Sequence, residues 1–175
     1  VSEWRKLIDE AESDIVVGLS EAKINLSFDD VVLTSKLIDG TFPDYQRVIP
    51  DSNERLLEVD RKDFAEAVDR VSTISTEKSR AVKLAIDKGV LTLSVTSLDQ
   101  GQAEEELEVS FDAEGLEIGF NSRYLLDIAE RIEGDKARFR LNDSASAAIV
   151  SDVDDANALY VIMPMRVMVN NALSL

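Results

Sequence analysis

Apolar and polar residues alternate along most of this chain, which is the period expected of half-buried β-strands. Turn signals separate many of the alternating segments, for example Asp87-Lys88-Gly89 and Asn142-Asp143-Ser144. The pattern therefore predicts a protein built mainly from short strands. The predicted strands lie near residues 14–19, 22–28, 31–36, 55–59, 81–87, 90–97, 104–110, 115–119, 136–142, 146–150 and 158–164.

Two segments have the period of an amphipathic helix instead, residues 61–75 and residues 122–133. Asp60 and Asn121 can cap their first turns, and Gly134 can end the second helix. A third, shorter helix is predicted at about residues 2–11. The apolar faces consist of Phe64, Ala67, Val68, Val71 and Ile74 in the first helix, and Tyr124, Leu125, Ile128, Ala129 and Ile132 in the second.

The order of these elements repeats along the chain. Residues 55–110 follow the order strand, helix and three strands, and residues 115–164 follow it again. Residues 2–36 have the same order without the first strand, so we expect the chain to begin inside one domain and to continue through a complete second one. The predicted fold class is α+β, with duplicated strand–helix–three-strand units and helices on one face of antiparallel sheets.

The amino-acid composition excludes several kinds of site and of catalytic mechanism. Hydrophobic residues make up 45% of the chain, which is enough for a sizeable core, and no apolar run is long enough to span a membrane. Cysteine and histidine are both absent, which excludes disulfides, thiolate or imidazole metal ligands, and Ser–His or Cys–His catalysis within this chain. We expect a cytoplasmic protein with no cofactor and no metal.

The net charge of −16, from 19 basic and 35 acidic side chains, argues against a protein that coats DNA, although an acidic body can still carry a basic face. The clustered acids allow a second interpretation, a hydrolase with paired carboxylates. The candidates are Glu104-Glu105-Glu106 and Asp152, Asp154 and Asp155. A metal site at the three aspartates is a separate alternative, but their run lacks the glycine turn and distal glutamate of a calcium loop. A solvated surface is the more usual role of such runs.

Three separated blocks resemble the bacterial β sliding clamp family, the DNA polymerase III beta subunit. They are Thr34–Pro50 (TSKLIDGTFPDYQRVIP), Glu117–Asp127 (EIGFNSRYLLD) and Tyr160–Val167 (YVIMPMRV), and they occur in the family's order and at its spacing. The resemblance implies that residues 1–42 are the end of domain two, residues 43–167 are domain three and residues 168–175 are an extension or tail. It further implies a processivity factor, in which two three-domain subunits close head to tail around duplex DNA, with helices lining the hole.

The resemblance also implies a pocket for short linear motifs that carry leucine and phenylalanine side chains. Its expected partners are the replicative DNA polymerase, the clamp loader, repair polymerases, and ligase or mismatch-repair proteins. A chain without its first domain is alternatively a peptide-binding module that forms no ring. The pocket residues implied are Pro43, Arg47, Val48, Asn121, Tyr124, Ala145, Ala147, Val161, Ile162, Met163, Pro164, Met165 and Arg166.

Two further surfaces follow from the resemblance. Lys62, Arg70, Arg123 and Arg131 are the implied DNA-facing cations, on helix faces that are otherwise typical of ordinary solvated surface. The implied ring interface, which closes the homodimer in the full-length protein, consists of Thr73, Ile74, Glu77 and Lys78. For Ile74, as for Val161, Ile162 and Met163, a place in the hydrophobic core remains the alternative.

Overall fold

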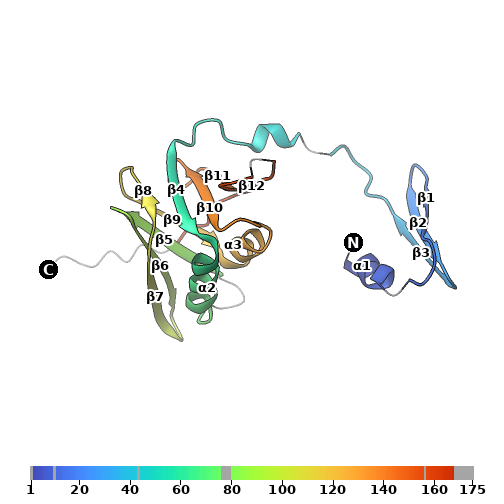
Figure 1. Cartoon of the computed structure of the whole chain (residues 1–175), viewed down its shortest axis with the longest axis horizontal. Coiled ribbons are helices and arrows are strands. Elements are labelled where there is room, and N and C mark those ends of the chain that lie inside the picture. The colour runs from blue at the N-terminus through green and yellow to red at the C-terminus, as the bar shows by residue number, and fades with distance from the viewer. Residues whose placement is uncertain (1, 10, 43, 76–79, 156, 168–175) are drawn as a thin grey trace. The chain divides into compact units, whose positions relative to one another are not determined.

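The computed structural model describes residues 2–9, 11–42, 44–75, 80–155 and 157–167, and the chain forms two compact units, Val1–Pro43 and Asp44–Leu175 (Figure 1). The N-terminal unit contains helix α1 (Ser2–Asp9) and a three-stranded antiparallel sheet in the order β1-β2-β3. Its buried apolar side chains include Leu26 and Phe28. The strands are β1 (Val16–Leu19), β2 (Lys23–Phe28) and β3 (Val31–Lys36).

The C-terminal unit contains the predicted duplication. After a short 3-10 helix η1 (Tyr45–Val48), strand, helix and three strands follow one another twice, with one very short extra strand between the repeats. The first repeat is β4 (Arg55–Asp60), α2 (Arg61–Ser72), β5 (Ala81–Asp87), β6 (Val90–Ser97) and β7 (Gly101–Glu108), followed by β8 (Ser110–Phe111). The second is β9 (Leu116–Asn121), α3 (Ser122–Ala129), β10 (Lys136–Leu141), β11 (Ala148–Asp152) and β12 (Leu159–Ile162).

The two repeats exchange their first strands. Strand β4 of the first repeat pairs with β10 of the second, which gives a five-stranded sheet in the order β12-β11-β10-β4-β8. Strand β9 of the second repeat pairs with β5 of the first, which gives a four-stranded sheet in the order β7-β6-β5-β9. The predicted fold class is confirmed, and each sheet contains strands of both repeats.

Helices α2 and α3 lie side by side and cover the inner faces of the sheets (Figure 1). Helix α2 buries Phe64, Ala67, Val68 and Val71, and α3 buries Leu125 and Ala129, as predicted. Tyr124, predicted on the same apolar face of α3, is 57% exposed instead. Phe64 meets Phe139 of β10 edge to face, with ring centroids 5.3 Å apart and an interplanar angle of 63°. This geometry is favourable for aromatic rings and fastens α2 to the five-stranded sheet.

Both predicted N-caps are confirmed. The Asp60 carboxylate accepts hydrogen bonds from the backbone N–H groups of Lys62 and Asp63, and the Asn121 side chain accepts one from the N–H of Arg123. The predicted helix ends were wrong, because α2 ends at Ser72 and α3 at Ala129. Elements η1 and β8 were not predicted. No helix in the described part of the chain is long and apolar enough to cross a membrane.

Candidate functional site

An open groove of about 580 Å³ runs between helix α3 and the last strand, β12. Its walls are mostly apolar, and Asp127 places one carboxylate among them. Within a protein of this size, exposed apolar side chains gathered in one groove are typical of an interaction site. The lining residues are Tyr124, Asp127 and Ile128 from α3, together with Leu159, Tyr160, Val161, Ile162 and Met163.

The side chains of the groove differ in how far they are exposed. Tyr124 is 57% exposed and Met163 is 65% exposed, so both offer apolar surface to a ligand. Ile162 is only 3% exposed and belongs to the hydrophobic core, so the core alternative applies to this residue. Ile162 therefore forms the floor of the groove, while Tyr124 and Met163 form its accessible rim.

A backbone contact holds the residues that follow the groove. The N–H of Met165 donates a hydrogen bond of 2.7 Å to the carbonyl oxygen of Gly119, which forms an isolated antiparallel bridge to β9. A Cβ atom at position 119 would lie only 2.7 Å from the Met165 carbonyl oxygen and would also collide with Val167. Glycine is therefore required at position 119 for the chain to cross the sheet so closely.

The groove brings together only part of the predicted pocket, namely Tyr124, Val161, Ile162 and Met163. Asn121 uses its side-chain oxygen to cap α3. Pro164, Met165 and Arg166 directly follow the groove, and Pro43 lies outside the described residues. Four lining residues were missed: Asp127 and Ile128, which lie one turn after Tyr124, and Leu159 and Tyr160, which begin β12. The helical spacing i, i+3 and i+4 was the signal for the first pair.

Arg47 and Val48, also predicted pocket residues, lie on η1. Both are exposed, and the Arg47 guanidinium forms an ion pair of 3.1 Å with Asp44. Their side chains are not among those that line the groove.

Ala145 and Ala147 belong to the loop between β10 and β11, which is held by internal hydrogen bonds. The Asp143 carboxylate accepts bonds from the backbone N–H groups of Ala145 and Ser146, at 2.8 and 2.7 Å, and from the Ser146 hydroxyl. These bonds, the one from Ala145 foremost, lower the pKa of Asp143. The carbonyl of Ala147 accepts a bond of 2.8 Å from the Asn53 amide.

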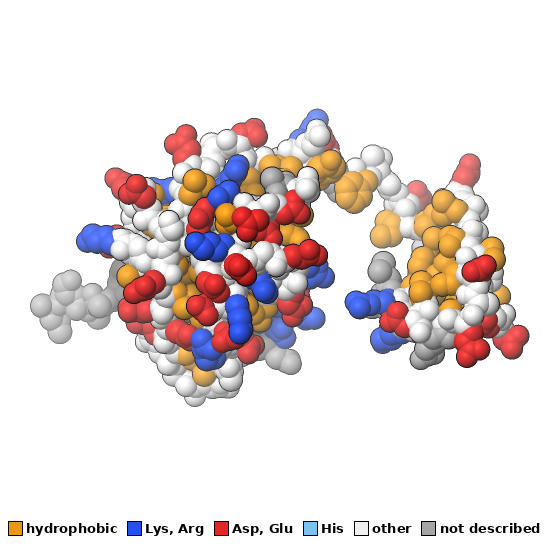
Figure 2. All heavy atoms as spheres, viewed as in Figure 1, with side chains coloured by type: hydrophobic (Ala, Val, Ile, Leu, Met, Phe, Trp, Pro, Cys, Tyr) orange, Lys and Arg blue, Asp and Glu red, His pale blue; other side chains and the backbone are white. Residues whose placement is uncertain are grey.

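The four predicted DNA-facing cations are all exposed, and their surroundings differ. Arg70 donates to Glu105 at 2.6 and 3.0 Å and forms an ion pair with Glu66, so its pKa is raised and that of Glu105 is lowered. The charge of Arg70 is therefore already balanced within the chain. Figure 2 shows the same mixture of acidic and basic side chains over the visible face of the C-terminal unit.

The other three cations are less engaged. Arg131 donates a hydrogen bond of 2.7 Å to the carbonyl of Asp127, which leaves its charge unbalanced. No ion pair involves Lys62 or Arg123 within the described residues.

The predicted ring interface is described only in part. Thr73 is exposed, and its hydroxyl donates to the carbonyl of Asp69, whereas Ile74 packs against the hydrophobic core. Glu77 and Lys78 lie outside the described residues.

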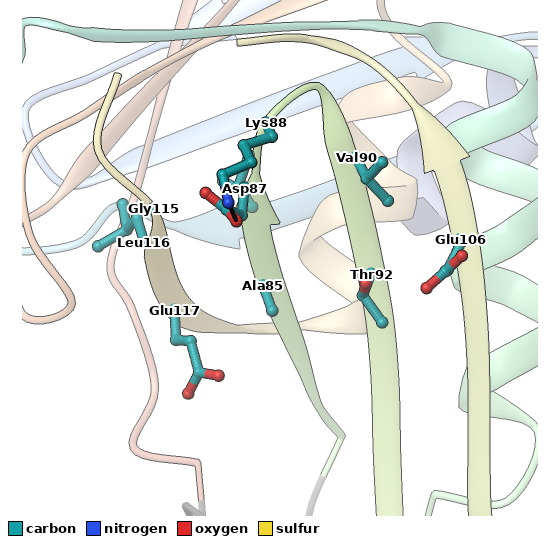
Figure 3. Close-up of a pocket in the computed structure, with 10 residues that line it drawn as sticks. Ala85, Asp87, Lys88, Val90, Thr92, Glu106, Gly115, Leu116 and Glu117 are labelled. Atoms are coloured by element: carbon teal, nitrogen blue, oxygen red, sulfur yellow. Dashed lines mark ion pairs between the residues drawn. The ribbon is translucent and has the colours of Figure 1, made fainter. Parts of the chain in front are cut away.

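A second, more polar groove lies on the outer face of the four-stranded sheet (Figure 3). Thr92 and Ala85 form its floor, and Glu106 and Glu117 stand on the strands at either side, in one row of the sheet register. Asp87 and Lys88 form an ion pair of 3.6 Å at its end. Within the residues the structure describes, no three His, Cys, Asp or Glu side chains are placed to hold a metal ion.

The aspartates of the hydrolase interpretation serve as turn acceptors. Asp152 accepts hydrogen bonds from the backbone N–H groups of Asp154 and Gly134, at 2.9 and 2.8 Å, and these bonds lower its pKa. Asp155 accepts from Asn157 in the same way. A general acid near neutral pH needs a raised pKa, so the geometry of Asp152 does not favour this chemistry.

Comparison with known proteins agrees with the fold. The family described as DNA polymerase III beta subunit, C-terminal domain, matches residues 46–166, and its central domain matches residues 1–44. The fold and these matches define the class of protein: the chain belongs to the DNA polymerase III beta subunit family.

Among individual relatives, the beta sliding clamp of Caulobacter vibrioides is 50% identical over 167 residues, which cover 95% of this chain and 45% of that protein. The beta sliding clamp of Pseudomonas aeruginosa is 38% identical, with the same two coverages. The chain thus spans about half the length of the curated relatives it matches.

Solved structures give the same result. The DnaN sliding clamp of Bartonella birtlesii has a TM-score of 0.82 and 53% identity, over 95% of this chain and 48% of that one. The clamp of Caulobacter crescentus has a TM-score of 0.83 and 50% identity, over 95% and 45%. The Bartonella protein has also been solved bound to griselimycin, with a TM-score of 0.81 and 53% identity over 93% of this chain and 44% of that one.

Proposed function

We propose that this chain is the C-terminal part of a DNA polymerase processivity factor, a ring that encircles duplex DNA in the cytoplasm, and that it has no enzymatic activity. Residues 1–42 would then be the end of the central domain, residues 43–167 the complete C-terminal domain, and residues 168–175 an extension. Relatives that carry the name beta sliding clamp support this role. The work of such a ring is topological, so it needs only weak contacts with DNA.

The observation that carries the proposal is the apolar groove between α3 and β12. A short peptide with leucine and phenylalanine side chains can bury them against Tyr124, Leu159 and Met163, which are exposed in the free chain. Methionine is flexible and polarisable, so one groove can accept different motifs. The replicative polymerase, the clamp loader, repair polymerases, and ligase or mismatch-repair proteins are the proposed partners.

The helices supply the proposed DNA side. Lys62 and Arg123 are exposed on α2 and α3, and Arg131 is exposed in the turn that follows α3, next to the acidic Glu130. A mixed surface of this kind attracts phosphates weakly and reads no bases, which suits a protein that slides. The net charge of −16 would at the same time discourage contacts with DNA elsewhere on the protein.

One observation also favours a second, narrower function. All residues that line the groove belong to the Asp44–Leu175 unit. We therefore propose, as the narrower alternative, that the chain alone acts as a peptide-binding module without a closed ring.

Fluorescence polarisation with a labelled Gln-Leu-Ser-Leu-Phe-type peptide tests the groove. We expect saturable binding, and a loss of about tenfold in affinity for Met163→Ala and for Tyr124→Ala, because each removes apolar surface that a ligand would bury. Leu98→Ala is the matched control, since Leu98 is an apolar side chain 91% exposed in the turn between β6 and β7. Equal affinities for Met163→Ala and Leu98→Ala would contradict the assignment of the groove.

A primer-extension assay with the full-length ring separates the clamp from the module. If the groove binds the polymerase, Met163→Ala should shorten the DNA synthesised each time the polymerase binds the primer. Peptide binding without any effect of the ring on product length would favour the module.

A further inference from the structure

A separate hollow of about 300 Å³ lies where the end of α2 meets the beginning of α3. It shares no lining residue with the groove described above. Its lining is polar apart from Leu126. The polar residues are Asp69, Ser72, Ser75, Arg80, Ser122 and Arg123.

The hydroxyl of Ser122 is the most informative group in this hollow. Ser122 is only 5% exposed, and its side chain has no hydrogen-bond partner in the described part of the chain. Its backbone N–H is occupied, because it donates to the carbonyl of Arg80 at 2.8 Å. The residue is largely buried, but its Oγ is not one of the buried side-chain atoms that lack a partner in the described chain, so the hydroxyl is accessible from the hollow, where it can bind a ligand or a water molecule.

The two arginines of the hollow add unbalanced positive charge. Within the described residues, neither Arg80 nor Arg123 forms an ion pair, in contrast to Arg70 and Arg138, whose guanidinium groups contact glutamates. Arg123 is exposed, and Arg80 is half-buried. Guanidinium groups beside hydroxyl groups suit the oxygens of a phosphate group.

The backbone of α3 also favours a bound anion, although less strongly than the two guanidinium groups do. The hollow lies at the positive end of α3, where the helix favours negative charge. Part of this end is already used, because Asn121 accepts the N–H of Arg123. Asp69 opposes an anion from the α2 side, so the two guanidinium groups leave a net charge of one positive unit.

We propose that Arg80, Ser122 and Arg123 form a seat for a backbone phosphate of duplex DNA, called here the phosphate seat. The inference rests on the proposed function, because the seat lies between the two helices that would face the DNA. Asp69 keeps the bound phosphate exchangeable, and a protein that slides needs contacts that form and break quickly. Sulfate and free phosphate share the same chemistry, so the test must distinguish them from DNA.

NMR titrations of the 175-residue chain test the seat through its backbone amide and arginine Nε–H signals. One arm adds a short DNA duplex at several salt concentrations, and the other adds inorganic phosphate at matched ionic strength. The duplex should shift the signals of Arg80 and Arg123. Arg80→Gln should reduce the slope of log affinity against log salt by about 1, because one phosphate contact is lost. Ser122→Ala should weaken duplex binding without changing this slope.

Arg140→Gln is the matched control. Arg140 is an exposed arginine on β10, on the face of the sheet away from the helices, so the same charge is removed where no DNA contact is expected. Equal slopes for Arg80→Gln and Arg140→Gln would overturn the seat, and so would an absence of duplex binding. Binding of inorganic phosphate without duplex binding would reassign the site to free anions and overturn the DNA contact. If Arg80→Gln and Ser122→Ala both leave duplex binding unchanged, the phosphate seat is overturned, but the proposed function still stands.

Discussion

Replacement of Gly119 by alanine tests how the end of the described chain is held against β9. The new Cβ would lie 2.7 Å from the carbonyl oxygen of Met165. The oxygen would have to retreat by about 0.7 Å to reach ordinary van der Waals distance. The hydrogen bond from the Met165 N–H to Gly119, now 2.7 Å long, would then be stretched to the limit of a useful bond.

The expected magnitude follows from three contributions. Loss of this hydrogen bond costs about 1 kcal/mol. Loss of packing by the half-buried Met165 and Val167 costs about 1 kcal/mol more. Alanine in a strand regains about 0.5–1 kcal/mol over glycine, because it loses less conformational entropy on folding. The net effect should be a loss of about 1 kcal/mol in the free energy of unfolding.

Urea unfolding followed by tyrosine emission provides the assay. The three tyrosines, Tyr45, Tyr124 and Tyr160, all lie in the C-terminal unit, so their emission reports on that unit. The decisive control is the same substitution in a chain that ends at Pro164, where the clash cannot occur. In that shortened chain, Gly119→Ala should raise the free energy of unfolding by about 0.5–1 kcal/mol. The coupling free energy between the substitution and the truncation would then be about 2 kcal/mol. An equal loss in both chains would refute the reasoning.

Three further changes probe other parts of the C-terminal unit. Asn53→Ala removes two hydrogen bonds of 2.8 and 2.9 Å to backbone carbonyls, and should lower the free energy of unfolding by about 2 kcal/mol in the same urea assay; an unchanged midpoint would contradict this. Phe64→Ala empties a fully buried site against Phe139 and should cost about 3–5 kcal/mol, whereas Phe64→Leu should cost less. The folded state lowers the pKa of Asp152, so its carboxylate stabilises the protein above the unfolded pKa of about 3.9, and this stabilisation is lost as the pH falls through the folded pKa. Asp152→Asn should therefore destabilise the protein at pH 6, and its difference from the unchanged chain should shrink below about pH 4; a difference independent of pH would argue against the role of the charge.

The periodicity of the sequence was sufficient to predict most helices and strands and the buried face of α2, but not the ends of the helices. Phe64, Ala67, Val68 and Val71 recur at helical spacing and are all buried, because one face of α2 must cover a sheet. The caps at Asp60 and Asn121 were predictable for a local reason, since each side chain satisfies N–H groups only two or three residues away.

The exchange of strands between the repeats was not predictable from the same pattern. Alternation in β4 and β9 indicates which side chains face the core, but it does not indicate which strand lies next to them. The pairs Leu57 with Phe139 and Ile118 with Leu84 depend on how the whole chain packs.

The groove was predictable only in part, for a similar reason. Its strand residues form one run, Val161, Ile162 and Met163, and the sequence gives no sign that Ile162 belongs to the core while Met163 is exposed. That division arises because β12 ends at Ile162 and the following residues turn toward Gly119. The hollow beside Ser122 is formed by residues between Asp69 and Arg80 together with residues of α3, which lie about 40 positions later in the sequence.

The exchanged strand β4 also has a mechanical consequence. In the C-terminal unit the chain first forms η1 and then enters the five-stranded sheet as β4, which lies between β10 and β8. β4 is in register with β10 over its whole length, from Arg55 opposite Leu141 to Asp60 opposite Lys136. A pull on the chain before β4 is therefore received by an interior strand with neighbours on both sides, and not by an edge strand that could peel away one bond at a time. The load is therefore carried first by the β4–β10 ladder in the interior of the sheet.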